Sequence, residues 1–424
     1  MAKETILHKI EDEEERVILV AVDADNSEDD TEKCLDELED LAKTAGAVTV
    51  GRVIQKRERV SAGYYVGSGK LDEIRTMINA FDATGIICDD ELTPAQMRNM
   101  EKILQTKVMD RTMLILDIFA ARAVSSEGKI QVELAQLKYR LSRLTGMGTS
   151  MSRLGGGIGT RGPGEKKLET DRRHIKERIH ELKSDLEEIR THRSLLRNQR
   201  SKSGRPVVSL VGYTNAGKST ILNSLTDAGV LEEDKLFATL DTTTRNVTLL
   251  GGSNIYLTDT VGFVQKLSHH LVEAFKATLE ELKFADILLH VVDASDENRV
   301  KHMEVVYSTL RDLGCGEKPV ITVFNKMDKE VEMPLPQDKN CCARVEICAK
   351  NQKSLENLLD VTEEVLKSFR KPMKVLIPYT EGSLLAVVHG KCEIINEEHT
   401  ENGTLIEAYM TDEAAGRLEK YKVE

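Results

Sequence analysis

The sequence lacks a long apolar run and an apolar signal segment. No hydrophobic stretch approaches the roughly 18 residues that a helix needs to cross a bilayer. The first sixteen residues are dense in charge and contain no apolar core followed by a cleavage site. These absences predict a protein without a membrane span that is located in the cytoplasm.

Regular cysteine pairs are also missing. The seven cysteines are scattered and contain no CxxC pair. An odd and scattered set does not suit a disulfide framework, and the lack of a CxxC pair does not suit a zinc site, so this pattern favours free thiols in a reducing compartment. A metal or redox role for the adjacent Cys341 and Cys342 is the minor alternative.

The chain carries a basic module inside an acidic whole. Its 424 residues are too many for a single core, which predicts several domains, and the formal net charge is −12. Residues 137–205 nevertheless hold 18 Lys and Arg against 8 Asp and Glu. Such a local excess of positive charge is suited to RNA phosphates.

Strand and helix patterns alternate from residue 16 to about residue 125, which predicts an α/β domain with a parallel sheet. We expect strands at 17–22, 48–54 and 85–88. The segment GSGK at 67–70 superficially resembles a phosphate loop. Leu71 stands where a Ser or Thr should bind magnesium, so we interpret the segment as a turn leading into a helix.

Two segments with apolar residues at helical spacing follow, and each predicts a helix with one apolar face. The first contains Leu134, Leu137, Leu141 and Leu144; the second contains Ile175, Ile179, Leu182, Leu186 and Ile189. The glycine-rich segment 146–167 between them predicts a helical hairpin with a long flexible tip. We expect RNA binding by the four cations of this tip, namely Arg153, Arg161, Lys166 and Lys167. A disordered linker is the alternative.

A third pattern begins after residue 203. Apolar runs at 207–213, 255–263, 287–295 and 320–328 each end in polar residues, which predicts a doubly wound, mostly parallel sheet. The tail from residue 372 predicts a small α+β domain. The fold class is therefore α/β. We expect an amino-terminal α/β domain, a helical hairpin, a doubly wound domain and a carboxyl-terminal domain at 1–128, 129–203, 204–371 and 372–424.

GYTNAGKS at 212–219 is a full match to the phosphate-loop pattern, placed directly after an apolar strand and before a helix. Backbone N–H groups of such a loop wrap the β-phosphate. Lys218 is expected to bridge the β- and γ-phosphates, and Ser219 to bind Mg²⁺. The predicted phosphate-binding residues are Gly212, Tyr213, Thr214, Asn215, Ala216, Gly217, Lys218, Ser219 and Thr220.

Further motifs in the right order favour guanine and a γ-phosphate switch. In DTVG, Asp259 can hold Mg²⁺ through water and the Gly262 N–H can reach a γ-phosphate. In NKMD, the Asp328 carboxylate can accept two hydrogen bonds from guanine, which adenine does not offer. These motifs and the Cys-Ala-Lys segment, where we expect a guanine contact through the Ala349 amide, contribute Asp259, Thr260, Val261, Gly262, Asn325, Lys326, Met327, Asp328, Cys348, Ala349 and Lys350.

Together with the segment 155–173 and YYVGSGKLDE, these motifs resemble the HflX family of ribosome-associated GTPases over nearly the whole chain. The resemblance implies Mg²⁺-dependent hydrolysis of GTP to GDP and phosphate. It further implies binding to the large ribosomal subunit and its rRNA, and splitting or rescue of stalled ribosomes. An RNA-binding ribosome-assembly module gated by nucleotide is the alternative. We expect a monomer.

Switch I is expected between the helix after the phosphate loop and the strand at residue 255, where FATLDTTTR at 237–245 offers Thr239, Thr242, Thr243 and Thr244 as magnesium ligands. Resemblance to related GTPases places the ligand in the FATLD part, at Phe237, Ala238, Thr239, Leu240 and Asp241, so Thr239 is favoured and Thr243 is the second choice. Threonines that merely favour a strand are the alternative. Phe263 stands where Ras-like proteins carry the glutamine that orients water. Because GxxNxGKS resembles cation-stimulated GTPases, we expect Asn215 to help bind K⁺. Lys218, Asn215 and Thr239 are therefore the predicted catalytic residues.

Overall fold

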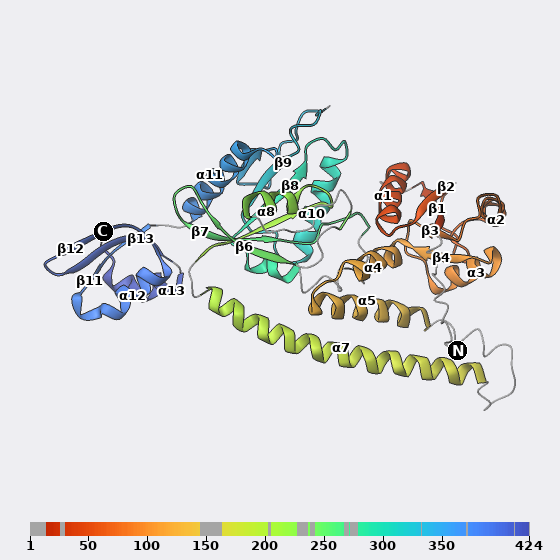
Figure 1. The fold of residues 1–424 in the computed structure, drawn as a ribbon, viewed down its shortest axis with the longest axis horizontal. Helices are drawn as coiled ribbons and strands as arrows, with labels where there is room; N and C mark the ends of the chain where they lie inside the picture. Colours follow the sequence, from red (N-terminus) through yellow and green to blue (C-terminus); the bar gives the residue numbers. More distant parts are fainter. Residues whose placement is uncertain are drawn as a thin grey trace, which may run out of the picture. The chain divides into compact units, whose positions relative to one another are not determined.

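The structure is a computed structural model (Figure 1). It describes residues 14–25, 30–144, 163–201, 205–226, 236–237, 242–266, 271, 279–331, 333–369, 372–410 and 412–423. Contacts divide the chain into two compact units. The first is built mainly from the amino-terminal part, and the second contains the phosphate loop and the carboxyl-terminal part.

The first unit contains a parallel sheet in the order β2-β1-β3-β4, which confirms the predicted sheet type. Its strands are β1 (Arg16–Ala24), β2 (Val48–Arg57), β3 (Gly85–Cys88) and β4 (Lys107–Asp110). Its helices are α1 (Thr31–Thr44), α2 (Ser68–Phe81), α3 (Pro94–Leu104) and α4 (Arg111–Arg122). β1 is apolar and buried from Val17 to Val22, as expected for an inner strand of a parallel sheet.

Local sequence explains where these helices begin. The Asp30 side chain caps α1 by accepting from two backbone N–H groups, and Thr93 forms a capping box with Gln96 at α3. Gly67 is the cap of α2, and Leu71 points into the core with 2% exposure. This confirms that GSGK is a turn leading into a helix.

Two long helices follow, α5 (Ser126–Leu144) and α7 (Pro163–Ser201). Arg178 of α7 and Glu133 of α5 form a bidentate ion pair, with 2.8 Å between Nε and Oε1. The expectation that all of 146–167 is loop is wrong at its carboxyl end. α7 begins at Pro163, a residue whose fixed φ suits the first turn of a helix, so Lys166 and Lys167 lie in the helix.

The second unit contains a six-stranded sheet in the order β10-β9-β8-β5-β7-β6. Its strands are β5 (Val207–Gly212), β6 (Thr243–Thr248), β7 (Asn254–Asp259), β8 (Ile287–Asp293), β9 (Val320–Asn325) and β10 (Ala343–Glu346). All pairs are parallel except β6 with β7, which confirms the doubly wound, mostly parallel sheet. The helices are α8 (Lys218–Thr226), η1 (Glu280–Phe284), α10 (Arg299–Asp312) and α11 (Gln352–Phe369).

The carboxyl-terminal residues form a small α+β fold, as predicted. Its antiparallel sheet has the order β11-β13-β12, with strands at Pro372–Ile377, Gly403–Tyr409 and Glu393–Thr400. The helices are η2 (Tyr379–Glu381), α12 (Gly382–Lys391), α13 (Asp412–Leu418) and η3 (Glu419–Tyr421). Val375, Val388 and Ile406 are fully buried in its core.

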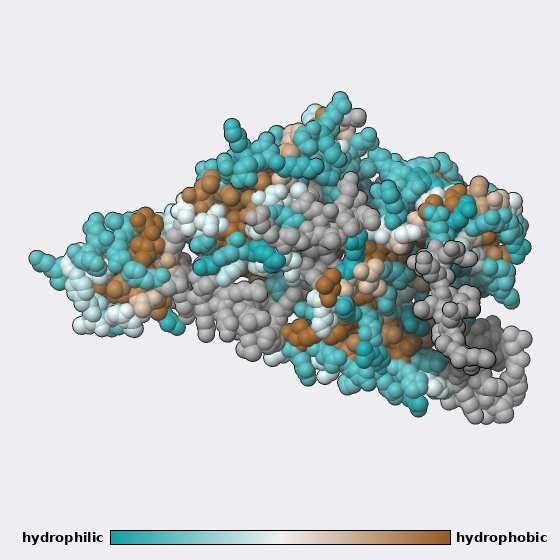
Figure 2. All heavy atoms as spheres, in the orientation of Figure 1, coloured by the Kyte–Doolittle hydropathy of each residue, from teal (hydrophilic) through white to brown (hydrophobic). Residues whose placement is uncertain are grey.

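Hydrophilic side chains predominate on the visible face, with apolar ones in smaller patches (Figure 2). Within the described ranges, no helix combines the length and the apolarity that a membrane crossing requires.

Candidate nucleotide-binding site

The phosphate loop joins the end of β5 to the start of α8 at the carboxyl edge of the sheet. Its backbone has positive φ at Gly212, Asn215 and Gly217. A Cβ on Gly217 would lie 2.2 Å from Nδ2 of Asn325, and one on Gly212 would lie 2.3 Å from the Val291 carbonyl oxygen. Both glycines are therefore required by space as well as by conformation.

Lys218 is enclosed by the loop. Its Nζ donates to the carbonyl oxygens of Gly212 and Tyr213, at 3.1 and 2.7 Å, and only 6% of the residue is exposed. Burial lowers the pKa of Lys218 to about 8, although the charge of Asp259 opposes that shift. A bound phosphate would favour the charged form, so the loop is built to receive an anion.

The two described residues that were predicted to hold magnesium lie together. Ser219 Oγ donates to Asp259 Oδ2 at 2.8 Å, and Asp259 is fully buried. A hydroxyl and a carboxylate are hard oxygen ligands of the kind that Mg²⁺ prefers, with water and phosphate completing its shell. These residues therefore fit the ion. Among the described residues there is no group of three or more His, Cys, Asp or Glu that could hold a metal.

The DTVG segment lies directly against the phosphate loop. A Cβ on Gly262 would approach Thr214 Cα to 2.8 Å and Lys218 Nζ to 3.1 Å. The hydroxyl of Thr260 donates to the Leu210 carbonyl oxygen at 2.7 Å, and Val261 is buried. Thr260 and Val261 thus fix the segment to the sheet, while Gly262 lies beside Lys218.

Asn325 connects the guanine motif to the phosphate loop. Its Nδ2 donates to the Ala216 carbonyl oxygen at 3.0 Å, and its Oδ1 accepts from the Ala349 N–H at 3.0 Å. The Ala349 amide is thus bonded within the protein, and its contact with guanine stays a prediction. Lys326 has a positive φ and its Nζ lies 2.7 Å from Asp293 Oδ2.

The remaining guanine residues lie at the surface beside Asn325. Asp328 and Lys350 are exposed, and the Met327 N–H donates to the Ile347 carbonyl oxygen at 3.2 Å. The Cys348 thiol lowers the pKa of Asp328 by hydrogen bonding to its carboxylate. Cys348 and Asp328 thus lie within contact of each other, and the binding of guanine by Asp328 stays a prediction.

Other predicted residues are placed only in part. Phe237 is buried with a positive φ, whereas Ala238, Thr239, Leu240 and Asp241 lie outside the described residues. Thr243 and Thr244 lie in β6, as the alternative interpretation of these threonines expected, and the Thr244 and Thr258 hydroxyls form a hydrogen bond of 3.0 Å. Their β-branched side chains favour that strand.

The remaining predicted residues belong to the phosphate loop, to the first turn of α8 and to the segment predicted to bind RNA. Asn215 is exposed in the phosphate loop, and Thr220 lies in the first turn of α8. Arg153 and Arg161 lie outside the described residues, and only the backbones of Lys166 and Lys167 are described.

Sequence reasoning missed two residues that support the site. Asp293 pairs with Lys326, and its place at the carboxyl end of β8 could have signalled that role. His302 of α10 stacks on the ring of Tyr213, with 3.7 Å between ring centroids. A helical histidine far away in the sequence gives no such signal.

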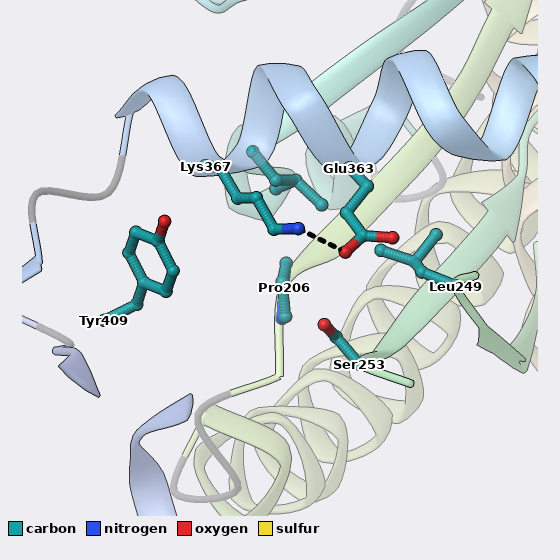
Figure 3. A pocket seen from close by; sticks show the side chains of 7 residues that line it. Pro206, Leu249, Ser253, Glu363, Lys367 and Tyr409 are labelled. Carbon is teal, nitrogen blue, oxygen red and sulfur yellow. Dashed lines mark hydrogen bonds and ion pairs between the residues drawn. The ribbon is translucent and has the colours of Figure 1, made fainter. Parts of the chain in front are cut away.

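The second unit also contains a pocket that lies apart from the nucleotide motifs in sequence (Figure 3). Glu363 of α11 accepts from the Gly251 N–H at 2.9 Å and from Lys367 Nζ at 2.6 Å. The lining comprises Pro206, Leu249, Ser253, Glu363, Leu366, Lys367 and Tyr409. None of these residues belongs to the nucleotide motifs.

Comparison with known proteins agrees with this geometry. Three family models match: "GTP-binding GTPase N-terminal" at residues 32–120, "GTP-binding GTPase Middle Region" at 122–200, and "50S ribosome-binding GTPase" at 207–326. GTPase HflX of Lacrimispora saccharolytica is 55% identical over 414 residues, which is 98% of each chain. GTPase HflX of Escherichia coli is 41% identical over 374 residues, which is 88% of each chain.

A solved GTP-binding protein of Sulfolobus solfataricus in complex with GDP is 24% identical, with a TM-score of 0.42, and covers 84% of this chain and 99% of its own. The phosphate loop, the DTVG segment and the NKMD motif on a doubly wound sheet define a P-loop GTPase. The chain belongs to the GTPase HflX family, as the resemblance predicted.

Proposed function

We propose that this GTPase binds the large ribosomal subunit and uses its GTP cycle to split or rescue stalled ribosomes. The observation that carries the proposal is the match of residues 207–326 to the "50S ribosome-binding GTPase" model, over a region that contains the described phosphate loop. The basic segment 137–205 supports it, because its excess of Lys and Arg suits rRNA phosphates.

In this proposal the phosphate loop and Lys218 bind the β- and γ-phosphates, while Asp328 selects guanine. Ser219, Asp259 and Thr239 would hold Mg²⁺, and the bound ion would supply charge neutralisation at the phosphates. The Gly262 N–H reports the presence of the γ-phosphate. The wrap of Lys218 by two carbonyl oxygens keeps the ammonium in place for this role.

Hydrolysis needs groups other than a switch II glutamine. The Phe263 side chain is apolar and 2% exposed, so it does not orient water. We assign part of the missing charge stabilisation to K⁺ bound with the help of Asn215, which is exposed in the phosphate loop. Turnover in potassium and in sodium buffer at matched ionic strength tests this assignment, and equal rates would remove it.

The decisive experiment is GTP turnover with and without purified large ribosomal subunits. We expect the subunit to raise turnover of the wild-type protein, because an incomplete site is completed by its partner. Lys218→Ala should lose turnover in both conditions. Unchanged turnover on addition of subunits would refute the ribosomal part of the proposal and leave the GTPase assignment intact.

The second candidate is a ribosome-assembly module in which nucleotide merely gates RNA affinity. Deletion of residues 150–164 separates the two. A rescue factor should lose subunit-stimulated hydrolysis on this deletion. An assembly module should lose RNA binding alone, with its hydrolysis rate unchanged.

The proposal also includes a cytoplasmic location, a monomeric state and the four-domain division at residues 128, 203 and 371. The monomer is tested by the mass of the full chain in analytical ultracentrifugation. Limited proteolysis tests the division, since cleavage should concentrate near those three boundaries.

A further inference from the structure

Helix α10 begins with a buried arginine that fixes its first turn. The Arg299 guanidinium donates from Nη1 to the carbonyl oxygens of Ala294 and Asp296, at 3.2 and 3.0 Å. Its Nη2 donates to the Pro334 carbonyl oxygen at 3.1 Å, and only 3% of Arg299 is exposed. The start of α10 is therefore fixed to the segment that follows β8 by bonds within the protein itself.

His302, in the first turn of α10, lies between a carboxylate and an aromatic ring. Its Nδ1 lies 3.1 Å from Oδ2 of Asp296. Its ring stacks on that of Tyr213, with 3.7 Å between the ring centroids and 7° between the ring planes. Burial acts to raise the pKa of Asp296, but the hydrogen bond with His302 opposes burial and the pKa falls below its ordinary value. Asp296 is therefore ionised at neutral pH and holds the imidazole in its stacked orientation.

Tyr213 connects this stack to the phosphate loop. The residue is only 8% exposed. Its backbone carbonyl oxygen accepts from Lys218 Nζ at 2.7 Å and from the Ala216 N–H at 3.4 Å. Because packing locks the Tyr213 side chain in one rotamer, it also limits the positions that the carbonyl of the same residue can take. The stack on His302 thus helps to determine where the Lys218 ammonium lies.

A role in stability alone is the simpler explanation, because aromatic pairs stabilise proteins wherever they occur. Two observations favour a role at the site. The residue that stacks on His302 is the one whose carbonyl contacts Lys218. In addition, α10 is held in place without the stack, by the bonds of Arg299 and by its buried residues Met303, Val306 and Leu310.

We propose that His302, oriented by Asp296, is a positioning residue for Lys218. It acts through the ring and the carbonyl of Tyr213, and it places Lys218 Nζ for the β- and γ-phosphates of the nucleotide. A small displacement of such a group is costly, because binding needs the ammonium at hydrogen-bond distance from the phosphate oxygens. GMP has neither of these phosphates, so its binding does not depend on this contact. The inference rests on the proposed nucleotide site.

The test compares His302→Ala, which removes the stack, with His302→Phe, which keeps an aromatic ring against Tyr213. Val306→Ala is the matched control, because Val306 is fully buried in the same helix and its truncation destabilises the fold without removing the stack. Competition against a fluorescent GDP derivative gives the Kd values for GDP, for a non-hydrolysable GTP analogue and for GMP. We expect His302→Ala to bind GDP and the GTP analogue about three- to tenfold more weakly, and His302→Phe to restore most of this loss.

Binding of GMP should stay unchanged in all three variants, and Val306→Ala should bind every nucleotide as the wild type does. If His302 is merely structural, GMP binding weakens as much as GDP binding, or Val306→Ala loses as much affinity as His302→Ala. Either result would overturn the proposal, and so would wild-type affinity for GDP in His302→Ala. If the wild-type protein binds none of the three nucleotides, the proposed site itself fails, which is a distinguishable outcome.

A double-mutant cycle tests the part assigned to Asp296. Asp296→Ala should weaken GDP binding in the same direction as His302→Ala. The double variant should bind GDP no more weakly than His302→Ala alone, because both side chains act through one contact with Tyr213. Additive losses would overturn the role of Asp296 in orienting the imidazole.

Discussion

Lys218 shows the sharpest opposition between burial and charge in the phosphate loop. Desolvation lowers its pKa from 10.5 to about 8, whereas Asp259 acts in the other direction. Because the folded pKa lies below the unfolded one, the charged lysine destabilises the fold at neutral pH, and this cost shrinks as pH rises from about 8 toward 10.5. A phosphate anion would offset the same cost by favouring the charged form.

We therefore predict that the Lys218 side chain titrates near pH 8 in the nucleotide-free protein. GDP should raise this midpoint, because the phosphates stabilise the ammonium. The measurement is the side-chain carbon shift of labelled lysine during a pH titration, assigned by its loss in Lys218→Arg. A midpoint near 10.5 without nucleotide would contradict the prediction.

At this scale the motif residues could be predicted because their chemistry follows from spacing along the chain. Ser219 and Asp259, which were both predicted to hold magnesium, are hydrogen-bonded to each other, and their binding of Mg²⁺ stays a prediction. The support from His302 and the internal bond of the Ala349 amide could not be predicted, since both depend on how distant segments pack.

At the scale of elements, β9 approaches the phosphate loop so closely that Gly217 has no room for a side chain. Gly217 and Gly252 both have positive φ, 96° and 88°, but only Gly217 is crowded, by Asn325. The two positions therefore separate backbone strain from steric collision.

We predict that Gly217→Ala abolishes GDP binding, because its Cβ would displace the Asn325 amide from the loop. Gly252→Ala should bind GDP normally and lose only about 1–2 kcal/mol of unfolding free energy to strain. Calorimetry with GDP and chemical denaturation provide the two measurements. Equal loss of GDP binding in both variants would show that strain, rather than collision, is responsible.

Helix α11 is bonded to the turn between β6 and β7 through Glu363. The Lys367 ammonium and the Gly251 N–H lower the pKa of Glu363, while burial opposes them. A lowered folded pKa means that this carboxylate stabilises the protein above the unfolded value, and that the stabilisation is lost as pH falls through the folded pKa.

Glu363→Ala should consequently destabilise the second unit by about 1–3 kcal/mol at neutral pH, since it leaves the Gly251 N–H without its acceptor. The adjacent Glu364→Ala is the control, because Glu364 is exposed. The difference between the two variants, measured by urea denaturation, should shrink below about pH 4.5, where carboxylates take up protons. If the difference in unfolding free energy persists in acid, the charge of the Glu363 carboxylate does not contribute to it.

The elements themselves could be predicted where the apolar period was long and clear, as for β5, β8 and β9. β6 was expected only as the alternative interpretation of the switch I threonines, because TTRNVT contains a single apolar residue, and pairing with β7 identifies it as a strand. The start of α7 was missed because glycine suggested loop up to residue 167, although Pro163 suits the first turn of a helix.

For the whole molecule, charge is concentrated in one region of an acidic chain. The net charge is −12, yet residues 137–205 carry 18 Lys and Arg against 8 Asp and Glu. Binding to the ribosome should therefore depend on this segment and on salt. The family resemblance predicted the ribosome as the partner, whereas the local positive charge alone would suit any polyanion.

We predict that replacing Arg153, Arg161, Lys166 and Lys167 by Ala weakens large-subunit binding and flattens its salt dependence. Four lost phosphate contacts should reduce the slope of log K against log salt by about 3–4. GTP hydrolysis without ribosomes should be unaltered. Affinity measurements from low to high potassium chloride test this, and an unchanged slope would place the RNA contacts elsewhere.

The side chain of Asn325 connects two segments that lie far apart in the sequence. Because its side chain is hydrogen-bonded to Ala216 on one side and to Ala349 on the other, Asn325 connects the segments predicted to bind guanine and phosphate by bonds within the protein itself. Ordering these loops then costs little at the moment of association. The contribution of the guanine nucleoside to binding should accordingly be the same in GDP and in GTP. The γ-phosphate would then change the state of the protein more than its affinity for nucleotide.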